Sequence, residues 1–253
     1  MYAPERQNEI VARARAAGRV DVATLAAELD VAAETVRRDL TVLERRGLLR
    51  RVHGGAVPVE RLTLEPSVDE RDLANTDAKD AIARAALALL DDASTIVIDG
   101  GTTTARLAAL LPENRELTVI THALPVAAAV ATRPGITLHL VGGHVRGRTL
   151  VATGPWTTAA LGSLRADVVV LGANGVSVAR GLTTPDLAEA EAKRALAAAG
   201  RRVIVLADHT KIGRDELVAF ATIESVDTLV TDEGVDPDLL TELAAAGVEV
   251  VTA

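Results

Sequence analysis

Glycines, hydroxyl groups and charged side chains follow several short Val- and Ile-rich runs of this 253-residue sequence. The first of these turns, Asp99-Gly100-Gly101-Thr102-Thr103-Thr104, precedes a predicted helix. Glycines allow a backbone to approach an anion, and the amides of a helix N-terminus hold it, with threonine hydroxyls as further donors. A carboxylate such as Asp99 accepts hydrogen bonds from hydroxyl groups. The turn therefore favours a small molecule that carries both a phosphate and hydroxyl groups.

Four further turns repeat this pattern after later runs. Lys211 in the last of them is one of three lysines in the chain, and we predict it as the counter-charge of a phosphate. A lone glycine turn is more often only a turn, so the prediction depends on all five turns converging at one edge of a parallel sheet. The predicted ligand contacts outside the first turn are Thr121, His122, Gly142, Gly143, Gly172, Asn174, Gly175 and Lys211.

The sequence lacks the residue patterns that are typical of nucleotide-cofactor sites and of metal sites. The sequence has no G-x-G-x-x-G motif and no Walker A lysine in the loop 100–104, which argues against a dinucleotide or nucleotide cofactor. His139 and His144 flank a glycine turn without a third metal ligand at a recognisable spacing. We therefore predict neither a metal nor a cofactor.

Arginines near the N-terminus indicate a second kind of chemistry. The segment 34–47 is predicted as an amphipathic helix, because Val36, Leu40 and Leu43 form an apolar stripe and Gly47 ends the helical pattern. A shorter predicted helix, 22–29, precedes it across a four-residue turn. Two short helices joined so tightly are typical of a helix-turn-helix, whose second helix enters the major groove of DNA.

The segment 48–57 is predicted as a short β-ribbon with a glycine turn, which is the form of a wing. Two surface helices with solvated charges would explain the helices alone, but the wing and the clustered arginines favour a winged helix-turn-helix. We expect the helix residues to face the groove and the wing residues to touch backbone phosphates. The predicted DNA contacts are Thr24, Glu34, Thr35, Arg37, Arg38, Arg50, Arg51, His53, Gly54 and Gly55.

Charge is divided unevenly along the chain. Residues 1–57 hold ten Arg against eight Asp and Glu, a balance of +2, whereas the remainder holds 17 basic and 27 acidic residues, a balance of −10. A weakly basic module on an acidic body suits a DNA reader whose other part does not touch DNA. The three aromatic residues leave no stacking platform for single strands, so the predicted partner is double-stranded DNA.

The pattern changes after residue 57, which predicts three regions: a DNA-binding domain at 1–57, a linker and connecting segment at 58–77, and a larger domain at 78–253. In the last, Val- and Ile-rich strands alternate with Ala-rich helices, which indicates an α/β domain with a parallel sheet. The predicted helices are 78–90, 103–110, 123–132, 186–199 and 237–246, and the predicted strands are 95–98, 117–120, 137–141, 168–171, 203–206, 228–230 and 248–251.

These motifs together resemble the DeoR family of transcriptional regulators over nearly the whole chain. The resemblance implies a winged helix-turn-helix followed by a sensor domain similar to ribose-5-phosphate isomerase, in a repressor of sugar-catabolic genes that a phosphorylated sugar releases. The matching N-terminal motifs are Leu25-Ala26, Thr35-Val36-Arg37-Arg38-Asp39-Leu40, Leu43-Glu44, Gly47, Leu49 and Arg51 with His53-Gly54-Gly55-Ala56. The matching C-terminal motifs are Asp99-Gly100-Gly101-Thr102-Thr103, Thr121-His122, Gly142-Gly143, Gly172-Ala173-Asn174-Gly175, Gly181-Leu182-Thr183-Thr184, Glu189-Ala190, Lys193 and Ala207-Asp208 with Lys211.

Two positions depart from the family pattern. Ala32 stands where such regulators commonly carry Ser at the start of the recognition helix, and the missing hydroxyl predicts a weaker N-cap. His122 stands where they commonly carry Asn, which implies a different ligand preference or a sensitivity to pH at this position.

The resemblance also raises an alternative, a sugar-phosphate isomerase-like enzyme with an appended DNA-binding head. Isomerases similar to the sensor domain carry carboxylates for proton transfer in the turn where Asn174 stands here. An amide cannot exchange a proton as a carboxylate does. Asp99 and Glu189 remain as candidate bases, so we predict a regulator without catalytic residues and keep the enzyme as the alternative.

The chain has no cysteine, no apolar run long enough to span a bilayer, and no apolar signal-peptide core at its N-terminus. We therefore expect a cytoplasmic protein without membrane contact. Because symmetric operators demand a symmetric reader, we also expect a homo-oligomer, a dimer or a tetramer. The residues leave open which sugar phosphate binds and whether transcription is repressed or activated.

Overall fold

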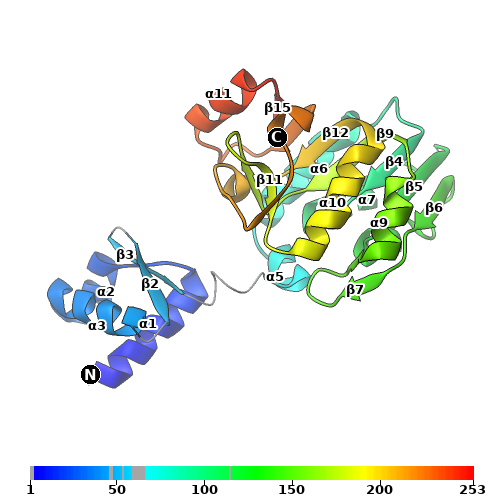
Figure 1. Cartoon of the computed structure of the whole chain (residues 1–253). Coiled ribbons are helices and arrows are strands. Elements are labelled where there is room, and N and C mark those ends of the chain that lie inside the picture. Colours follow the sequence, from blue (N-terminus) through cyan, green and yellow to red (C-terminus); the bar gives the residue numbers. More distant parts are fainter. Residues whose placement is uncertain (1–2, 46–47, 53, 59–65, 114) are drawn as a thin grey trace. The chain divides into compact units, whose positions relative to one another are not determined.

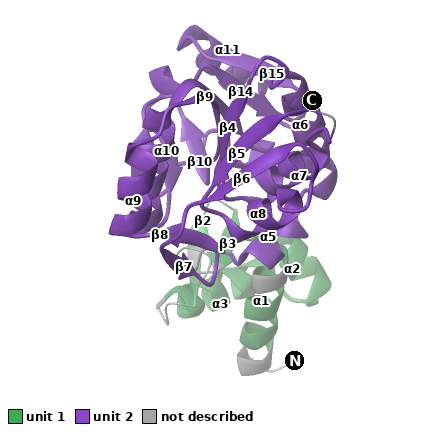
Figure 2. Cartoon of the chain, turned by 90° about the vertical axis from the view of Figure 1, so that its right-hand side faces the viewer, with its two compact units in different colours: residues 1–65 green, residues 66–253 purple. Residues whose placement is uncertain are grey.

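The computed structural model describes residues 3–45, 48–52, 54–58, 66–113 and 115–253. The chain forms two compact units, Met1–Glu65 and Pro66–Ala253, each with its own hydrophobic core (Figure 2). The segment 59–65 and the predicted helix stop at Gly47 lie outside the described residues. None of the described helices has the length and apolar character needed to cross a membrane.

Unit 1 is a winged helix-turn-helix, as the sequence predicts. Its helices are α1 (Ala3–Ala17), α2 (Val22–Glu28) and α3 (Ala33–Arg45), and its strands are β1 (Val20–Asp21), β2 (Leu49–Val52) and β3 (Gly55–Pro58) (Figure 1). The strands form an antiparallel sheet in the order β1-β3-β2. The predicted stripe of α3 is buried in a core that α1 and α2 complete. Helix α1, which the sequence analysis did not predict, contributes Ile10, Val11 and Ala14 to that core.

Polar contacts fix the orientation of the helices in unit 1. Asp39 on α3 is buried, and its carboxylate accepts hydrogen bonds from Arg6 Nε at 2.6 Å and Gln7 Nε2 at 2.9 Å, both on α1. The Asp21 carboxylate caps α2 by accepting hydrogen bonds from the amides of Ala23 and Thr24, at 2.8 and 3.1 Å. The Asp39 contacts therefore hold the inner face of α3 against α1, and the Asp21 contacts fix the start of α2.

Unit 2 is built on a parallel sheet that contains all seven predicted strands. They are β4 (Thr95–Ile98), β5 (Leu117–Thr121), β6 (Ile136–Leu140), β9 (Ala166–Gly172), β12 (Gly200–Leu206), β14 (Thr228–Thr231) and β15 (Glu249–Thr252). The strand order is β15-β14-β12-β9-β4-β5-β6, and every pairing is parallel. The carboxyl ends of the strands therefore share one edge, as the site prediction requires.

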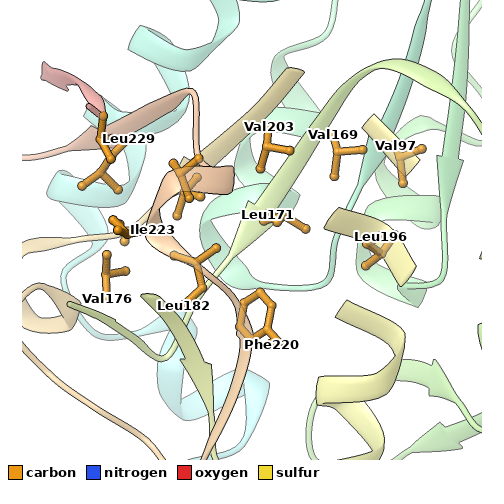
Figure 3. Close-up of a cluster of buried hydrophobic side chains, with 14 of the residues drawn as sticks. Val97, Val169, Leu171, Val176, Leu182, Leu196, Val203, Phe220, Ile223 and Leu229 are labelled. Atoms are coloured by element: carbon orange, nitrogen blue, oxygen red, sulfur yellow. The ribbon is translucent and has the colours of Figure 1, made fainter. Parts of the chain in front are cut away.

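Helices cover both faces of this sheet, because alternate residues of each strand point to opposite sides. Ile96 and Ile98 of β4 pack in the core with α6 (Thr76–Ala88), α7 (Thr102–Leu110) and α8 (Leu124–Val130). Val97 packs in the opposite core with α9 (Pro155–Gly162), α10 (Leu187–Ala199) and α11 (Pro237–Ala245). Figure 3 shows Val97 in a row with neighbouring strand residues on the side where Leu196 of α10 lies.

Several small elements of unit 2 were not predicted. They are α5 (Val68–Asp72), the hairpin of β7 (His144–Arg146) and β8 (Val151–Thr153), a sheet of β10 (Gly175–Ser177), β11 (Gly181–Thr184) and β13 (Val218–Ala221), and the 3₁₀ turns η1 (His209–Lys211) and η2 (Ile223–Ser225). The predicted connecting segment 58–77 thus contains a helix of unit 2 and the start of α6. Short polar elements of this kind carry too little periodicity to be recognised from sequence.

Candidate functional site

A pocket opens at the carboxyl edge of the sheet in unit 2. Its walls come from the ends of β4, β5, β9 and β12, the N-terminus of α7, the α5–α6 connection and helix α10. All three lysines of the chain line it, although they lie far apart in sequence. The lining residues are Arg71, Ala74, Asn75, Lys79, Asp99, Gly100, Gly101, Thr102, Thr103, Thr104, His122, Thr149, Val151, Gly172, Ala173, Asn174, Glu189, Lys193, Leu206, Ala207, Asp208 and Lys211.

Asp99, at the end of β4, is the centre of the pocket floor and is only 1% exposed. Its Oδ2 atom accepts hydrogen bonds from the Lys193 ammonium group and from the Gly172 amide, the latter at 3.0 Å. Its Oδ1 atom accepts from the Gly100 amide at 2.7 Å and lies 3.1 Å from His122 Nε2. Both oxygens are therefore occupied by the protein itself, and Asp99 organises the floor.

The charge state of Asp99 follows from these contacts. Burial by itself would raise the pKa of the carboxyl group, but the charge of Lys193 and the hydrogen bond with His122 outweigh it and lower the pKa to about 2. The Lys193 ammonium group also donates to the Gly172 carbonyl at 2.9 Å and lies 5.2 Å from the centre of the Phe220 ring. The pair is thus a buried, fully bonded ion pair.

His122, at the end of β5, joins three strands. Its Nδ1 atom lies 2.7 Å from the Ala152 carbonyl oxygen on β8, and its Nε2 atom faces Asp99, which directly follows β4. Both partners are acceptors, so the ring makes both hydrogen bonds only when both of its nitrogens carry protons. The position at which this chain departs from the family pattern therefore sits in the pocket wall as a cross-link.

Glu189, in the first turn of α10, is buried and forms a second ion-pair cluster. Its carboxylate accepts hydrogen bonds from the Arg146 guanidinium group and the Thr149 hydroxyl. Arg146 also lies 3.0 Å from Asp186, which caps α10. This cluster fastens the β7–β8 hairpin to α10 and closes one side of the pocket.

The opposite side of the pocket gathers positive charge. Burial lowers the pKa of Lys211; the Asp208 carboxylate opposes that shift, and the charges of Arg214 and Arg71 add to it. Burial also lowers the pKa of Lys79, with Asp208 again opposing and Arg106 and Lys211 adding. Asp208 is buried and shared, because its Oδ1 atom also accepts hydrogen bonds from Asn75 Nδ2 at 3.1 Å and from Thr210. No described residue accepts a hydrogen bond from the Lys211 ammonium group.

Most of the predicted ligand residues meet in this pocket, but four do not line it. The Thr121 hydroxyl is buried, donating to the Ile98 carbonyl at 2.7 Å. Gly143 allows a close packing contact, because an added Cβ would lie 1.9 Å from the Thr157 hydroxyl, which bonds the Gly142 carbonyl. A Cβ on Gly175 would lie 2.3 Å from the Arg214 carbonyl oxygen. These glycine turns are explained by packing within unit 2. The four residues outside the pocket lining are Thr121, Gly142, Gly143 and Gly175.

Other pocket residues were not predicted as ligand contacts. Lys79 and Lys193 lie within helices, and Arg71 and Thr149 lie in short segments without a recognisable pattern. Two features of the sequence could have pointed to these residues. Glu189 and Lys193 belong to a motif of the family resemblance, and lysine is scarce in the chain. The packing of a helix decides which of its faces turns towards the sheet edge. Neither feature of the sequence therefore placed these residues in the pocket.

The predicted DNA contacts on α3 are largely exposed. The side chains of Glu34, Arg37 and Arg38 are 63%, 54% and 82% exposed, whereas Thr35 is half-buried. Arg37 Nη1 lies 3.2 Å from a Glu34 carboxylate oxygen, and Arg38 Nε lies 4.0 Å from the other. Thr24 is exposed on α2 beside the Asp21 cap. The arginines are thus held loosely at the outer face of the helix.

The wing residues differ in their placement. Arg51 is exposed, with its Nη1 atom 3.3 Å from the Thr41 hydroxyl and its amide donating to Glu44 at 3.0 Å. Gly54 has a φ of +77°, which glycine adopts without strain, at the turn between β2 and β3. Gly55 is buried, and an added Cβ would lie 1.9 Å from the Val20 carbonyl oxygen. His53 and the side chain of Arg50 lie outside the described part of the chain.

The described residues contain no cluster of three or more His, Asp or Glu side chains that could hold a metal ion. The pocket is lined by cations, by glycine-rich backbone and threonine hydroxyls, and by the carboxylates of Asp99, Glu189 and Asp208. Helix α7 begins in the pocket lining at Thr102, and its N-cap residue Gly101 supplies no side-chain cap, so its first amides are available to an anion.

Each of the two units matches a known protein domain family. Residues 6–61 match the DeoR-like helix-turn-helix domain, and residues 74–233 match the DeoR C terminal sensor domain. The putative aga operon transcriptional repressor of Escherichia coli O157:H7 is 32% identical over 98% of this chain and 93% of its own length. The HTH-type transcriptional regulator GlpR of Haloferax volcanii is 34% identical over 99% of this chain and 98% of its own length.

Two solved structures align with part of this chain. The ribose 5-phosphate isomerase A of Methanocaldococcus jannaschii aligns with a TM-score of 0.39 and 17% identity, covering 55% of this chain and 55% of the isomerase. The eIF2B beta subunit of Chaetomium thermophilum aligns with a TM-score of 0.43 and 16% identity, covering 61% of this chain and 48% of that subunit. Because both TM-scores are below 0.5, neither likeness supports an argument about this chain.

Proposed function

Because the chain belongs to the DeoR family of transcriptional regulators, we propose that it is a repressor that a phosphorylated sugar releases from its operator. DNA binding by unit 1 is the function that the family shares. Regulators of this family are not enzymes, so the isomerase-like alternative is set aside. The identity of the effector as a sugar phosphate, its place in the pocket of unit 2 and the sign of regulation are our proposals.

The observation that carries the proposal is the gathering of cations beside an uncapped helix N-terminus. Lys211 lies in the pocket with Asp208 and Glu216 as opposing charges, and Arg71 and Lys79 lie close to it. A phosphate dianion held there would relieve the mutual repulsion of these cations and bind the first amides of α7.

The remaining lining residues suit the hydroxyl groups of a sugar. Thr102 and Thr103 place hydroxyls at the start of α7, and Asn174 places an amide at the end of β9. The hydrogen-bonding capacity of Asp99 is occupied by the protein, so we assign it the role of fixing Lys193 and His122 instead of binding sugar hydroxyls.

The test is fluorescence anisotropy of the full chain on its own upstream DNA, titrated at fixed salt with a panel of aldose and ketose phosphates. We expect tight binding that one compound of the panel releases. In Lys211→Ala that compound should bind at least roughly tenfold more weakly by calorimetry, because a hydrogen bond to a charged group is lost. Operator affinity without effector should stay unchanged.

The matched control is Arg84→Ala, which removes an exposed cation of α6 that does not line the pocket. This variant should behave as the wild type. Operator binding that responds to no sugar phosphate would contradict the proposed effector, and unchanged affinity in Lys211→Ala would contradict its proposed role.

Two further expectations accompany this function. A symmetric operator is read by two DNA-binding units, so we propose a homodimer or a homotetramer, which light scattering of the full chain on and off its operator would measure. We also propose that the protein acts in the cytoplasm, because a transcriptional regulator must reach chromosomal DNA.

A further inference from the structure

Helix α5 is the first element of unit 2 along the chain, directly after the residues that follow the wing. It is five residues long and has no buried side chain. Its next residue, Leu73, is 85% exposed. A helix of this length is not stable alone, and the hydrophobic effect does not hold it, so polar contacts must keep it in place.

Polar contacts lie at both ends of α5, in addition to the capping box of Ser67 and Glu70. The Val68 amide donates to the Arg148 carbonyl, in the turn of the β7–β8 hairpin, at 2.8 Å. Arg106 on α7 pairs with the Asp72 carboxylate and donates to the Asp72 carbonyl. The Lys79 ammonium group donates to the carbonyls of Arg71 and Ala74, which join α5 to α6.

The same short segment also forms part of the pocket wall. Arg71, Ala74 and Asn75 line the pocket together with Lys211 and Asp208, which come from the far end of the sequence. The charges of Arg71 and Lys211 are close enough that Arg71 contributes to the lowered pKa of Lys211. Two like charges therefore lie at a short helix that has no buried side chain.

We infer that Arg71 binds the anionic group of the effector together with Lys211, and that this contact fixes α5 so that pocket occupancy reaches the chain leading to the DNA-binding unit. The inference rests on the proposed function of the pocket. An anion between the two cations replaces their repulsion with two charge-assisted hydrogen bonds. The anion binds more tightly when α5 is ordered than when α5 is loosened. This difference in affinity couples the pocket to the DNA-binding unit.

The first test uses the full chain and inorganic phosphate as the probe. Hydrogen–deuterium exchange of the amides at 66–75 should slow when phosphate is added, because α5 becomes fixed. In Arg71→Ala, phosphate should bind roughly tenfold or more weakly, and at saturating phosphate the slowing at 66–75 should be absent. Arg84→Ala again serves as the control and should keep both the affinity and the slowing.

The second test loosens α5 without touching the pocket. Val68 is the first residue of α5, where proline is tolerated, and Ser67 already has the extended conformation that must precede a proline. Val68→Pro removes the amide that bonds the Arg148 carbonyl, and Val68→Ala keeps that amide while removing the same side chain. We expect faster exchange at 66–75 in Val68→Pro than in Val68→Ala, while phosphate still binds both.

The outcomes separate this inference from the proposed function. Phosphate binding with unchanged exchange at 66–75, or wild-type affinity in Arg71→Ala, would overturn the inference and leave the effector pocket standing. If neither inorganic phosphate nor any sugar phosphate of the panel binds the wild type, both the proposed function and the inference are overturned.

Discussion

The positively charged side chains of the two units differ in their exposure and in their internal contacts. In unit 1, the arginines of α3 project from the outer face of the helix, and Arg38 lies no closer than 4.0 Å to its acidic neighbour Glu34. In unit 2, Lys79 and Lys193 are each 4% exposed. The ammonium groups of both are held by carbonyl or carboxylate oxygens.

This difference agrees with the two partners that we propose, duplex DNA for unit 1 and a small anion for unit 2. Duplex DNA is a large surface of phosphates that displaces counterions, so exposed arginines on long side chains reach it without first breaking strong internal bonds. A small anion has few contacts to offer, so its site must be built beforehand from buried groups whose desolvation is already balanced. Exposed cations therefore serve binding and contribute little to folding, whereas buried cations contribute to both.

The buried carboxylates of the two units also differ. Asp39 of unit 1 joins α1 to α3 through Arg6 and Gln7, on the face of α3 that is turned towards the core. Asp99 of unit 2 joins a helix and two strand ends in the pocket lining. Asp39 therefore orients α3 against α1, whereas Asp99 links the stability of unit 2 to the shape of its pocket.

The largest effect is expected from breaking the buried pair of unit 2. Asp99→Asn removes the charge opposite Lys193 and leaves a buried ammonium group without its anion. The free energy of unfolding of unit 2 should fall by about 3–5 kcal/mol, measured by urea denaturation. Glu34→Gln is the matched control, because it breaks an exposed pair of unit 1 and should cost less than about 1 kcal/mol. Equal losses in the two variants would contradict the comparison.

An intermediate effect is expected from pH. The folded pKa of Asp99 is about 2, below the ordinary value of 3.8, so its ionised form stabilises unit 2 fully above pH 3.8. That contribution should be lost as the pH falls from 3.8 towards 2, and it amounts to roughly 2 kcal/mol. Urea denaturation across this range should show a smaller pH dependence in Asp99→Asn than in the wild type. A pH dependence that the substitution leaves unaltered would argue against the assigned ion pair.

The smallest effect on folding is expected on α3. Arg38→Ala should change the free energy of unfolding by less than about 0.5 kcal/mol, because the side chain is exposed. It should nevertheless weaken operator binding by about 1–3 kcal/mol, since arginine binds guanine through two hydrogen bonds in the major groove. Anisotropy measures the affinity, and calorimetry should show the same effector affinity as the wild type. Unaltered operator affinity would remove Arg38 from the DNA contacts.

Sequence patterns were sufficient to predict elements whose buried residues recur at a regular spacing along the chain. The stripe of Val36, Leu40 and Leu43 predicted α3, and the Val- and Ile-rich runs predicted all seven strands of the sheet. Because parallel strands end at one edge, the turns at Asp99, Gly172 and Lys211 were expected to meet, and they do. The patterns also predicted Gly142, Gly143 and Gly175 as ligand contacts. The structure places them outside the pocket lining, where close packing accounts for Gly143 and Gly175.

The sequence by itself therefore determined the two units, the order of most of their main elements and the sheet edge at which the pocket lies, because hydrophobic periodicity and strand direction are local properties of the chain. Only the tertiary structure decided that Lys79 and Lys193 enter the site from helices, that the Asp99 oxygens are occupied by the protein, and that Arg71 joins the pocket from α5. These facts depend on helix packing and on contacts between residues far apart in sequence, and no spacing along the chain encodes them.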